Sequence, residues 1–177
     1  MSEEIQKTET MAEDGKVKTF NVVFNVEGKA VGKMRNEIKG QMVSPVVDEA
    51  FEMATDEGAA HGGDMTAPPP LAYFCTGFVA CLMTQIRAFS RRMRVPIGEL
   101  TVKAHIEWEA RVEGRDPYTS RPVAFRLDVD FDSDASFEDQ KRLLDAAQKG
   151  CFVEATLANP IPVNHRLMID GDFKDAD

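Results

Sequence analysis

Three cysteines are the residues of this 177-residue chain whose side chains could do covalent chemistry: Cys75, Cys81 and Cys151. A cysteine thiolate is a nucleophile, and oxidation can carry it reversibly to a sulfenic acid and then to a disulfide. A free cysteine in an apolar helix is also a common small hydrophobic residue. The sequence around each thiol separates these two possibilities.

Cys75 and Cys81 lie in an apolar stretch that runs from Pro68 to Arg94. No residue between positions 71 and 86 is charged, and apolar side chains occur all around a 3.6-residue period, which predicts a helix buried on every side. Prolines at its start and arginines at its end suit the two ends of a helix. Because a membrane span needs roughly 20 apolar residues, we interpret this shorter run as the central helix of a soluble core.

The spacing of the three cysteines in the sequence indicates which of them could form a pair. Cys75 precedes Cys81 by six residues, or about 240 degrees around a helix of 3.6 residues per turn, so these two point in different directions and cannot form a disulfide. We interpret Cys75 as a structural apolar residue. Cys151 follows the helix-ending Gly150 and precedes a short predicted helical turn, where free amide protons would favour a thiolate. Cys81 and Cys151 are therefore the pair that could meet in the fold.

The expected elements combine strands and helices in one domain over residues 16–170, between a disordered tail at 1–15 and an acidic tail at 171–177. Alternation at 17–26 predicts a half-buried strand that Gly28 turns, and a loop rich in Gly and Pro leads to the central helix. Ser136 opens a later helix, with Asp139 in capping-box position. We expect strands near 17–26, 30–38, 42–47, 100–112, 123–131 and 161–169, and helices over 68–94, 136–150 and 151–158.

Composition limits the partners and the compartment. A formal charge of -9 disfavours a nucleic acid or an anionic membrane as partner, since neither offers positive charge to an acidic surface. The first residues carry no apolar signal-peptide core, and an odd number of cysteines fits reduced thiols better than a disulfide framework. We therefore expect a cytoplasmic protein.

Other charged groups have simpler interpretations than binding sites. Asp128, Asp130, Asp132 and Asp134 resemble the opening of a calcium loop, but alternation along a strand also places them together on a solvated face. The arginines after position 86 could bind a phosphate, or they could simply complement the helix dipole. The three histidines lack metal-type spacing, and there is no glycine-rich phosphate loop, so we expect neither a metal nor a cofactor.

The motifs around the cysteines resemble those of the OsmC/Ohr family, which are thiol-dependent peroxidases and their relatives. A loop rich in Gly and acids leads to TAPPPL at 66–71, and Cys81 follows eleven residues after Pro70. KGCFV at 149–153 and PIPV at 160–163 are similar to the family's second cysteine and final strand. The order of the expected elements also matches, and the resemblance covers residues 17–169.

The resemblance implies an α+β, OsmC-like fold, with antiparallel sheets wrapped around long central helices in an intertwined homodimer. It implies that Cys81 attacks an organic hydroperoxide, that Cys151 resolves the sulfenic acid as a disulfide, and that a dithiol reopens it, in defence against oxidative stress. An arginine that holds the thiolate would be Arg35, the only arginine before position 87. The family's usual glutamate after the helix-opening proline is absent, because Leu71 and Ala72 stand there.

Two other functions remain as alternatives. A dimer of this fold that lacks the chemistry could bind a small apolar ligand or act as a scaffold, and the missing glutamate favours that interpretation. A hot-dog-type thioesterase also packs a long apolar helix against a sheet, but it would leave the paired cysteine contexts unexplained. The peroxidase remains the leading hypothesis, and the apolar residues Phe74, Phe78 and Leu82 would suit a fatty or aryl peroxide.

Overall fold

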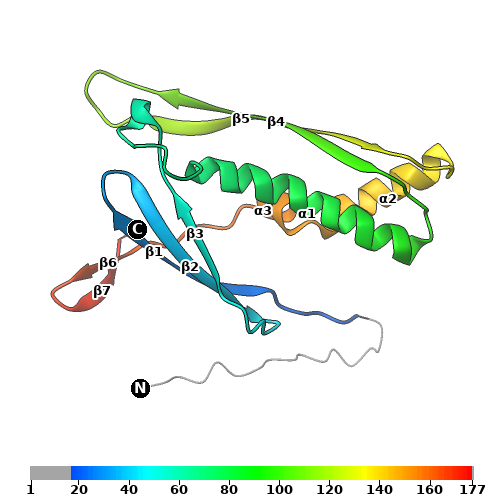
Figure 1. Cartoon of the computed structure of the whole chain (residues 1–177). Coiled ribbons are helices and arrows are strands. Elements are labelled where there is room, and N and C mark those ends of the chain that lie inside the picture. The colour runs from blue at the N-terminus through cyan, green and yellow to red at the C-terminus, as the bar shows by residue number, and fades with distance from the viewer. Residues whose placement is uncertain (1–16, 177) are drawn as a thin grey trace. The chain divides into compact units, whose positions relative to one another are not determined.

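The computed structural model describes residues 17–176 and divides the chain into two compact units, one ending at Pro70 and the other beginning at Leu71. Within these residues the N-terminal unit holds a three-stranded sheet, and the C-terminal unit holds helices, a long hairpin and a short one (Figure 1). All strand pairs are antiparallel, which confirms the predicted α+β class. The expected tail at 1–15 lies outside the described residues, and the single domain over 16–170 stays a prediction.

The N-terminal unit is a meander of β1 (Val23–Val31), β2 (Arg35–Ser44) and β3 (Phe51–Thr55). Three strands before the long helix are thus confirmed, but their predicted bounds are wrong. Gly28 lies within β1, and the turn comes at Gly32, whose φ of 67° is easily adopted by glycine alone. The predicted half-burial of the first strand is also wrong, because no layer of this unit covers β1 and its residues are exposed up to position 30.

The predicted strand at 42–47 is not a separate element. Its first residues end β2, Pro45 cannot donate a ladder hydrogen bond, and the third strand begins only at Phe51. Phe51 lies opposite Gly40, and its ring occupies the space that a Cβ at Gly40 would fill. A glycine inside a strand pattern is the sequence signal for this close approach.

The loop after β3 folds back onto its own start. The Asp56 amide donates to the Pro68 carbonyl at 3.2 Å, and the Met65 amide donates to the Glu57 carbonyl at 3.0 Å. These two hydrogen bonds join the beginning of the loop to its end. They place Thr66 beside Asp56, the residue that directly follows β3.

The C-terminal unit is built on α1 (Pro70–Met93) and on the hairpin of β4 (Leu100–Arg111) and β5 (Thr119–Phe131). The predicted long hairpin is confirmed: its strands pair along their whole length, with one register shift beside Trp108. α1 lies along this hairpin (Figure 1). The alternation of apolar and charged residues is what makes one face of the hairpin suitable for a helix.

Two further helices follow, α2 (Phe137–Gly150) and α3 (Phe152–Ala158), with Cys151 alone between them. The predicted capping box is confirmed. The Ser136 hydroxyl accepts from the Asp139 amide at 3.2 Å and donates to the Asp139 carboxylate at 2.9 Å. α2 therefore begins where the sequence places it.

The end of the chain differs from its prediction. The expected strand at 161–169 is shortened to β6 (Arg166–Ile169), and part of the expected acidic tail forms β7 (Asp172–Asp175), which pairs with it. Asp170 and Gly171 turn the chain, with φ values of 54° and 88°. Asp-Gly is a strong hairpin signal, and it marks this turn in the sequence.

The buried core of the C-terminal unit joins α1 to α2 and to Cys151; its members are Leu82, Ile86, Val95, Leu143, Ala147 and Cys151. The prediction that α1 is buried on every side is wrong for the described chain. Its buried residues form one stripe at four-residue steps, Phe78, Leu82, Ile86 and Ser90. By length and composition alone α1 also qualifies as a membrane span. Leu82 and Ile86 of this stripe belong to the buried core.

Candidate active site

Cys81 lies midway along α1, and aromatic contacts hold this part of the helix against the hairpin. Phe78, one turn earlier, meets Phe125 edge-to-face with 5.8 Å between ring centroids, and Phe74 meets Trp108 in the same way at 5.8 Å. The Cys81 side chain is partly exposed and packs against the buried core. These aromatic contacts hold the half of α1 that leads to Cys81 against the hairpin.

Cys151 comes close to α1 because Gly150 lets α2 end against it. A Cβ at Gly150 would lie 2.7 Å from the Phe89 ring, so a larger residue would push the two helices apart. Cys151 is 0% exposed and packs in the same core as Leu143 and Ala147 of α2. Packing therefore explains both residues of the Gly-Cys pair: Gly150 allows the close approach to α1, and Cys151 fills part of the core.

The thiols of Cys81 and Cys151 lie near each other, in and against the same buried core, and each is close enough to influence the protonation of the other. Burial raises the pKa of the Cys151 thiol to about 11; contact with Cys81 also raises it, whereas the amide protons of Glu154 and Val153 oppose the rise. The predicted preference for a thiolate at Cys151 is therefore wrong. The amide protons are present, but removal from water outweighs them, so Cys151 is a protonated thiol at neutral pH.

The other cysteine stays apart from this pair. Cys75 is free and partly exposed, and α1 is continuous from Cys75 to Cys81, so the two lie on different sides of the helix. Of the three predicted site residues, the structure brings Cys81 and Cys151 together. Arg35 belongs to the N-terminal unit, and its proximity to the thiols stays a prediction.

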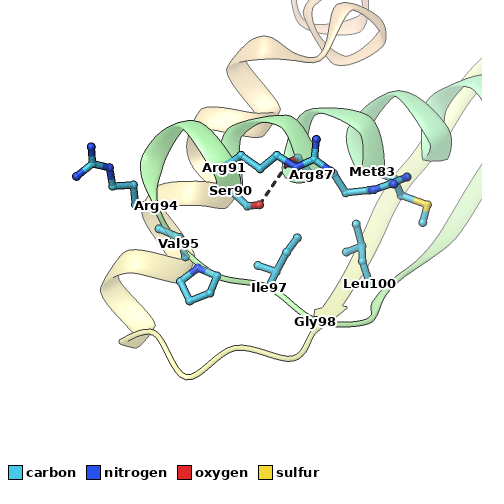
Figure 2. A pocket seen from close by; sticks show the side chains of 10 residues that line it. Met83, Arg87, Ser90, Arg91, Arg94, Val95, Ile97, Gly98 and Leu100 are labelled. Carbon is cyan, nitrogen blue, oxygen red and sulfur yellow. Dashed lines mark hydrogen bonds between the residues drawn. The ribbon is translucent and has the colours of Figure 1, made fainter.

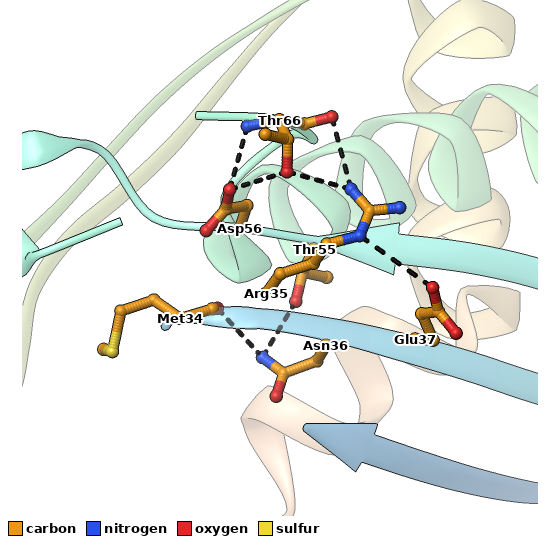
Figure 3. Close-up of polar contacts among 7 residues, drawn as sticks. All are labelled: Met34, Arg35, Asn36, Glu37, Thr55, Asp56 and Thr66. Atoms are coloured by element: carbon orange, nitrogen blue, oxygen red, sulfur yellow. Dashed lines mark hydrogen bonds and ion pairs between the residues drawn. The ribbon is translucent and has the colours of Figure 1, made fainter. Parts of the chain in front are cut away.

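Arg35 opens β2 and is held by Thr66 (Figure 3). Its Nη1 donates to the Thr66 hydroxyl at 2.9 Å and to the Thr66 carbonyl at 3.4 Å. The hydroxyl and the amide of Thr66 in turn donate to Oδ2 of Asp56 at 2.7 and 2.9 Å. Asp56 is 2% exposed, and the Thr66 donors, with the amides of Glu57 and Asp64, lower the pKa of its carboxyl.

Sequence reasoning does not find Asp56, Thr66 or Glu154. The first two meet only through strand register and loop closure, which no local pattern encodes. Glu154 is the third residue of α3, and its Oε1 is buried without a hydrogen-bond partner among residues 17–176. Burial raises the pKa of its carboxyl. No sequence signal marks it, since its burial depends on how α3 packs.

The arginine-rich end of α1 borders an open cavity of about 640 Å³ (Figure 2). Its lining includes neither Cys81 nor Cys151, and consists of Met83, Arg87, Ser90, Arg91, Arg94, Val95, Pro96, Ile97, Gly98 and Leu100. The cations lie in and beside the last turns of the helix, where the dipole interpretation places them.

The acidic residues of β5 lie where alternation predicts them. Asp128 and Asp130 are exposed on the outward face of the hairpin, and Asp132 and Asp134 are exposed beyond it. In the described part of the chain no three His, Cys, Asp or Glu side chains come together in a way that could hold a metal ion.

Known proteins resemble this chain in sequence and in fold. A family model described as OsmC-like protein matches residues 61–166. The solved structure of an OsmC-like hydroperoxide resistance protein from Jannaschia sp. CCS1 is 44% identical, with a TM-score of 0.60; the match covers 88% of this chain and 98% of that one. A search of curated proteins found no match.

More distant solved structures share the fold. A putative osmotic stress induced and detoxification response protein from Psychrobacter arcticus 273-4 is 19% identical, with a TM-score of 0.54, over 74% of this chain and 85% of that one. An OsmC-like protein from Mycoplasma pneumoniae is 17% identical, with a TM-score of 0.51, over 81% and 89%. The chain therefore belongs to the OsmC-like family, that of the OsmC/Ohr hydroperoxide resistance proteins.

Proposed function

We propose that this protein is a thiol-dependent peroxidase that reduces organic hydroperoxides through Cys81 and Cys151. The observation that carries the proposal is the closeness of the two thiols, one partly exposed in α1 and one buried between α2 and α3. Two nearby cysteines can form a disulfide when their Cα atoms lie within about 7 Å of each other. Similarity to the hydroperoxide resistance protein from Jannaschia supports the substrate class.

The proposed reaction has three steps. The Cys81 thiolate attacks the terminal oxygen of the hydroperoxide, the O–O bond breaks, and the alkoxide leaves and takes a proton to become an alcohol. The Cys151 sulfur then attacks the sulfur of the Cys81 sulfenic acid and releases water as the disulfide forms. A dithiol reductant reopens the disulfide by thiol exchange and is itself oxidised to a disulfide.

Exposure and protonation support this division of roles. Cys81 is partly exposed and can meet a substrate, whereas Cys151 is buried with a pKa of about 11 and is a poor first nucleophile. Contact with the Cys81 thiol is one cause of that raised pKa. Oxidation of Cys81 removes this cause, so Cys151 becomes easier to deprotonate when its attack is required.

Arg35 is the proposed partner of the Cys81 thiolate. A cation near a thiol favours the charged form and so increases the nucleophile's population. The guanidinium uses Nη1 to contact Thr66, while Nε lies 4.0 Å from the Glu37 carboxylate. Nη2 makes no hydrogen bond with residues 17–176, which leaves it for another group.

The peroxide specificity is proposed from the apolar surroundings of Cys81. Phe78 and Leu82 are 4% and 1% exposed, so they belong to the core and do not line an open site. Phe74 is only partly buried, and Cys81 packs against apolar residues. These surroundings favour an organic hydroperoxide over hydrogen peroxide, because an apolar substituent gains from leaving water.

A turnover assay tests this function. Reduced protein with excess dithiol should consume cumene hydroperoxide faster than hydrogen peroxide, whereas a Cys81→Ser control should match the uncatalysed rate. Loss of peroxide and loss of dithiol should be equal in moles. A protein that accelerates neither reaction would contradict the proposal.

We also propose that the protein is a homodimer. Among residues 17–176 only seven apolar residues are buried, whereas 23 large ones are exposed. Large exposed apolar patches often mark surfaces that bind another protein. A second copy would cover part of this surface, as closed two-fold assembly does in most small oligomers. Light scattering at micromolar concentration should therefore give about twice the subunit mass of 19.7 kDa. A mass that stays at one subunit on concentration would contradict the dimer.

A further inference from the structure

Strand register places Arg35 and Asp56 opposite each other. β2 and β3 pair antiparallel, and their outermost pair is Asn36 with Thr55. One step further along both strands come Arg35 and Asp56, so these two occupy the next cross-strand position. Side chains at such positions lie on the same face and within reach of each other.

Thr66 fills the space between these two side chains. The loop that closes with the Asp56 amide on the Pro68 carbonyl returns Thr66 to the end of β3. An arginine can only donate hydrogen bonds and a carboxylate can only accept them, so the Thr66 hydroxyl must accept from Arg35 and donate to Asp56. The hydroxyl has the single proton and the lone pairs that both bonds require (Figure 3).

The buried end of this hydrogen-bond relay is charged. Asp56 is 2% exposed, and its carboxylate oxygens accept from the Glu57 amide and from two donors of Thr66. A buried carboxylate is costly unless such donors satisfy it, and three of them make its orientation specific. Thr66 links the Asp56 carboxylate to the Arg35 guanidinium through hydrogen bonds.

The open end of the relay is the guanidinium. A cavity of about 150 Å³ borders the relay and is lined by Arg35, Thr66 and Asp56, together with Lys33 and Asp64. Lys33 and Asp64 are paired with each other at 2.8 Å on the exposed side of the loop. Arg35 is therefore anchored through Nη1 while Nη2 remains available.

We propose that Asp56 and Thr66 are positioning residues that hold the Arg35 guanidinium in place for the reaction at Cys81. The inference rests on the proposed peroxidase function for its last step, because Arg35 acts there as the partner of the thiolate. The first part of the proposal is independent of that function: the Thr66 hydroxyl determines where the Arg35 guanidinium points.

Two substitutions at one position test the relay. Thr66→Val keeps the shape of the side chain and removes the hydroxyl, whereas Thr66→Ser keeps the hydroxyl. Asp64→Asn is the matched control, because it removes an exposed ion pair of the same loop and leaves the relay intact. Asp56→Asn, which removes the buried charge, is the second variant should Thr66→Val melt too early to study.

The first readout is the Nε–H signal of Arg35 in nuclear magnetic resonance, which needs no peroxide. Thr66→Val should shift this signal and lower its order parameter, and Asp56→Asn should act in the same direction. Thr66→Ser and Asp64→Asn should leave the signal as in the unsubstituted protein. An unchanged, ordered Arg35 in Thr66→Val would overturn the relay, whatever the protein's activity.

The second readout is the rate of the first oxidation of Cys81 by cumene hydroperoxide, measured by trapping the sulfenic acid. Thr66→Val should lower the rate at least about tenfold, because small displacements of a positioned group have effects of this size. The rate should approach that of Arg35→Met, and Thr66→Ser should restore it. If Thr66→Val releases Arg35 but leaves the rate unchanged, the link to Cys81 is overturned. If the unsubstituted protein is not oxidised, the proposed function fails, and the Arg35 signal still decides the relay.

Discussion

Replacing Cys81 with serine is expected to abolish peroxide turnover, whereas replacing Cys151 with serine should leave the first oxidation intact. The reason is the division of roles: without the attacking thiol no sulfenic acid forms, but without the resolving thiol the sulfenic acid forms and then persists. In Cys151→Ser we expect one fast oxidation of Cys81, followed by stalling or by slow overoxidation to the sulfinic acid.

Trapping with dimedone followed by mass spectrometry measures both outcomes. Cys151→Ser should gain one adduct at Cys81, and Cys81→Ser should gain none. Cys75→Ser is the matched control, since that thiol lies on another side of α1 and should leave turnover unchanged. Equal losses in Cys81→Ser and Cys151→Ser, with no adduct in either, would contradict the assignment of roles.

The two thiols of the reduced protein are also expected to differ greatly in reactivity toward an alkylating agent. A thiol with a pKa of about 11 is a thiolate in only roughly one molecule in a thousand at about pH 8. Cys151 is in addition 0% exposed, whereas Cys81 is partly exposed. Iodoacetamide should therefore modify Cys81 long before Cys151.

The direction of the pH dependence follows from the sign of the shift. Because burial raises the pKa of Cys151, its thiolate fraction stays small through neutral pH and grows about tenfold per pH unit as the pH rises toward 11. Peptide mapping of the alkylated protein at several pH values measures this. A Cys81→Ala variant should label Cys151 at lower pH, because one cause of the raised pKa is gone. Equal labelling of both cysteines at neutral pH would contradict the buried, protonated state.

Sequence patterns predict the parts of the fold that are determined by residues close together in the chain. The apolar run of α1, the alternation in β4 and β5 and the capping box at Ser136 each follow from residues within one element. The N-terminal strands are predicted less well, because their bounds depend on pairing. Gly28 serves as a strand residue opposite Ile38, although a glycine in a sequence usually suggests a turn.

In the candidate site, too, sequence patterns predict the features with local causes and miss those that depend on tertiary packing. The motifs around Cys81 and Cys151 indicate the pair, but their closeness comes from tertiary packing, such as that of Gly150 against Phe89, which no local pattern encodes. The sequence predicts a lowered pKa for Cys151, whereas burial raises it. The amide protons at the start of a helix can be inferred from the sequence, but burial cannot.

The relay behind Arg35 is invisible to local patterns for a related reason. Asp56 and Arg35 lie 21 residues apart, and only the register of β2 with β3 brings them opposite each other. At the start of α1 the resemblance to the OsmC/Ohr family calls for a glutamate that this chain lacks, at Leu71 and Ala72. In our proposal Asp56 supplies a carboxylate through Thr66, so an acidic group still orients the arginine.

The central claim is that Cys81 and Cys151 form a reversible redox pair, and mass spectrometry after treatment with one equivalent of an organic hydroperoxide tests it most directly. We predict an intact mass lower by two hydrogens, a peptide map with one disulfide between Cys81 and Cys151, reduced Cys75, and full reversal by a dithiol. Protein that remains unmodified under excess peroxide would contradict the claim, and a ligand-binding or scaffold role would then replace it.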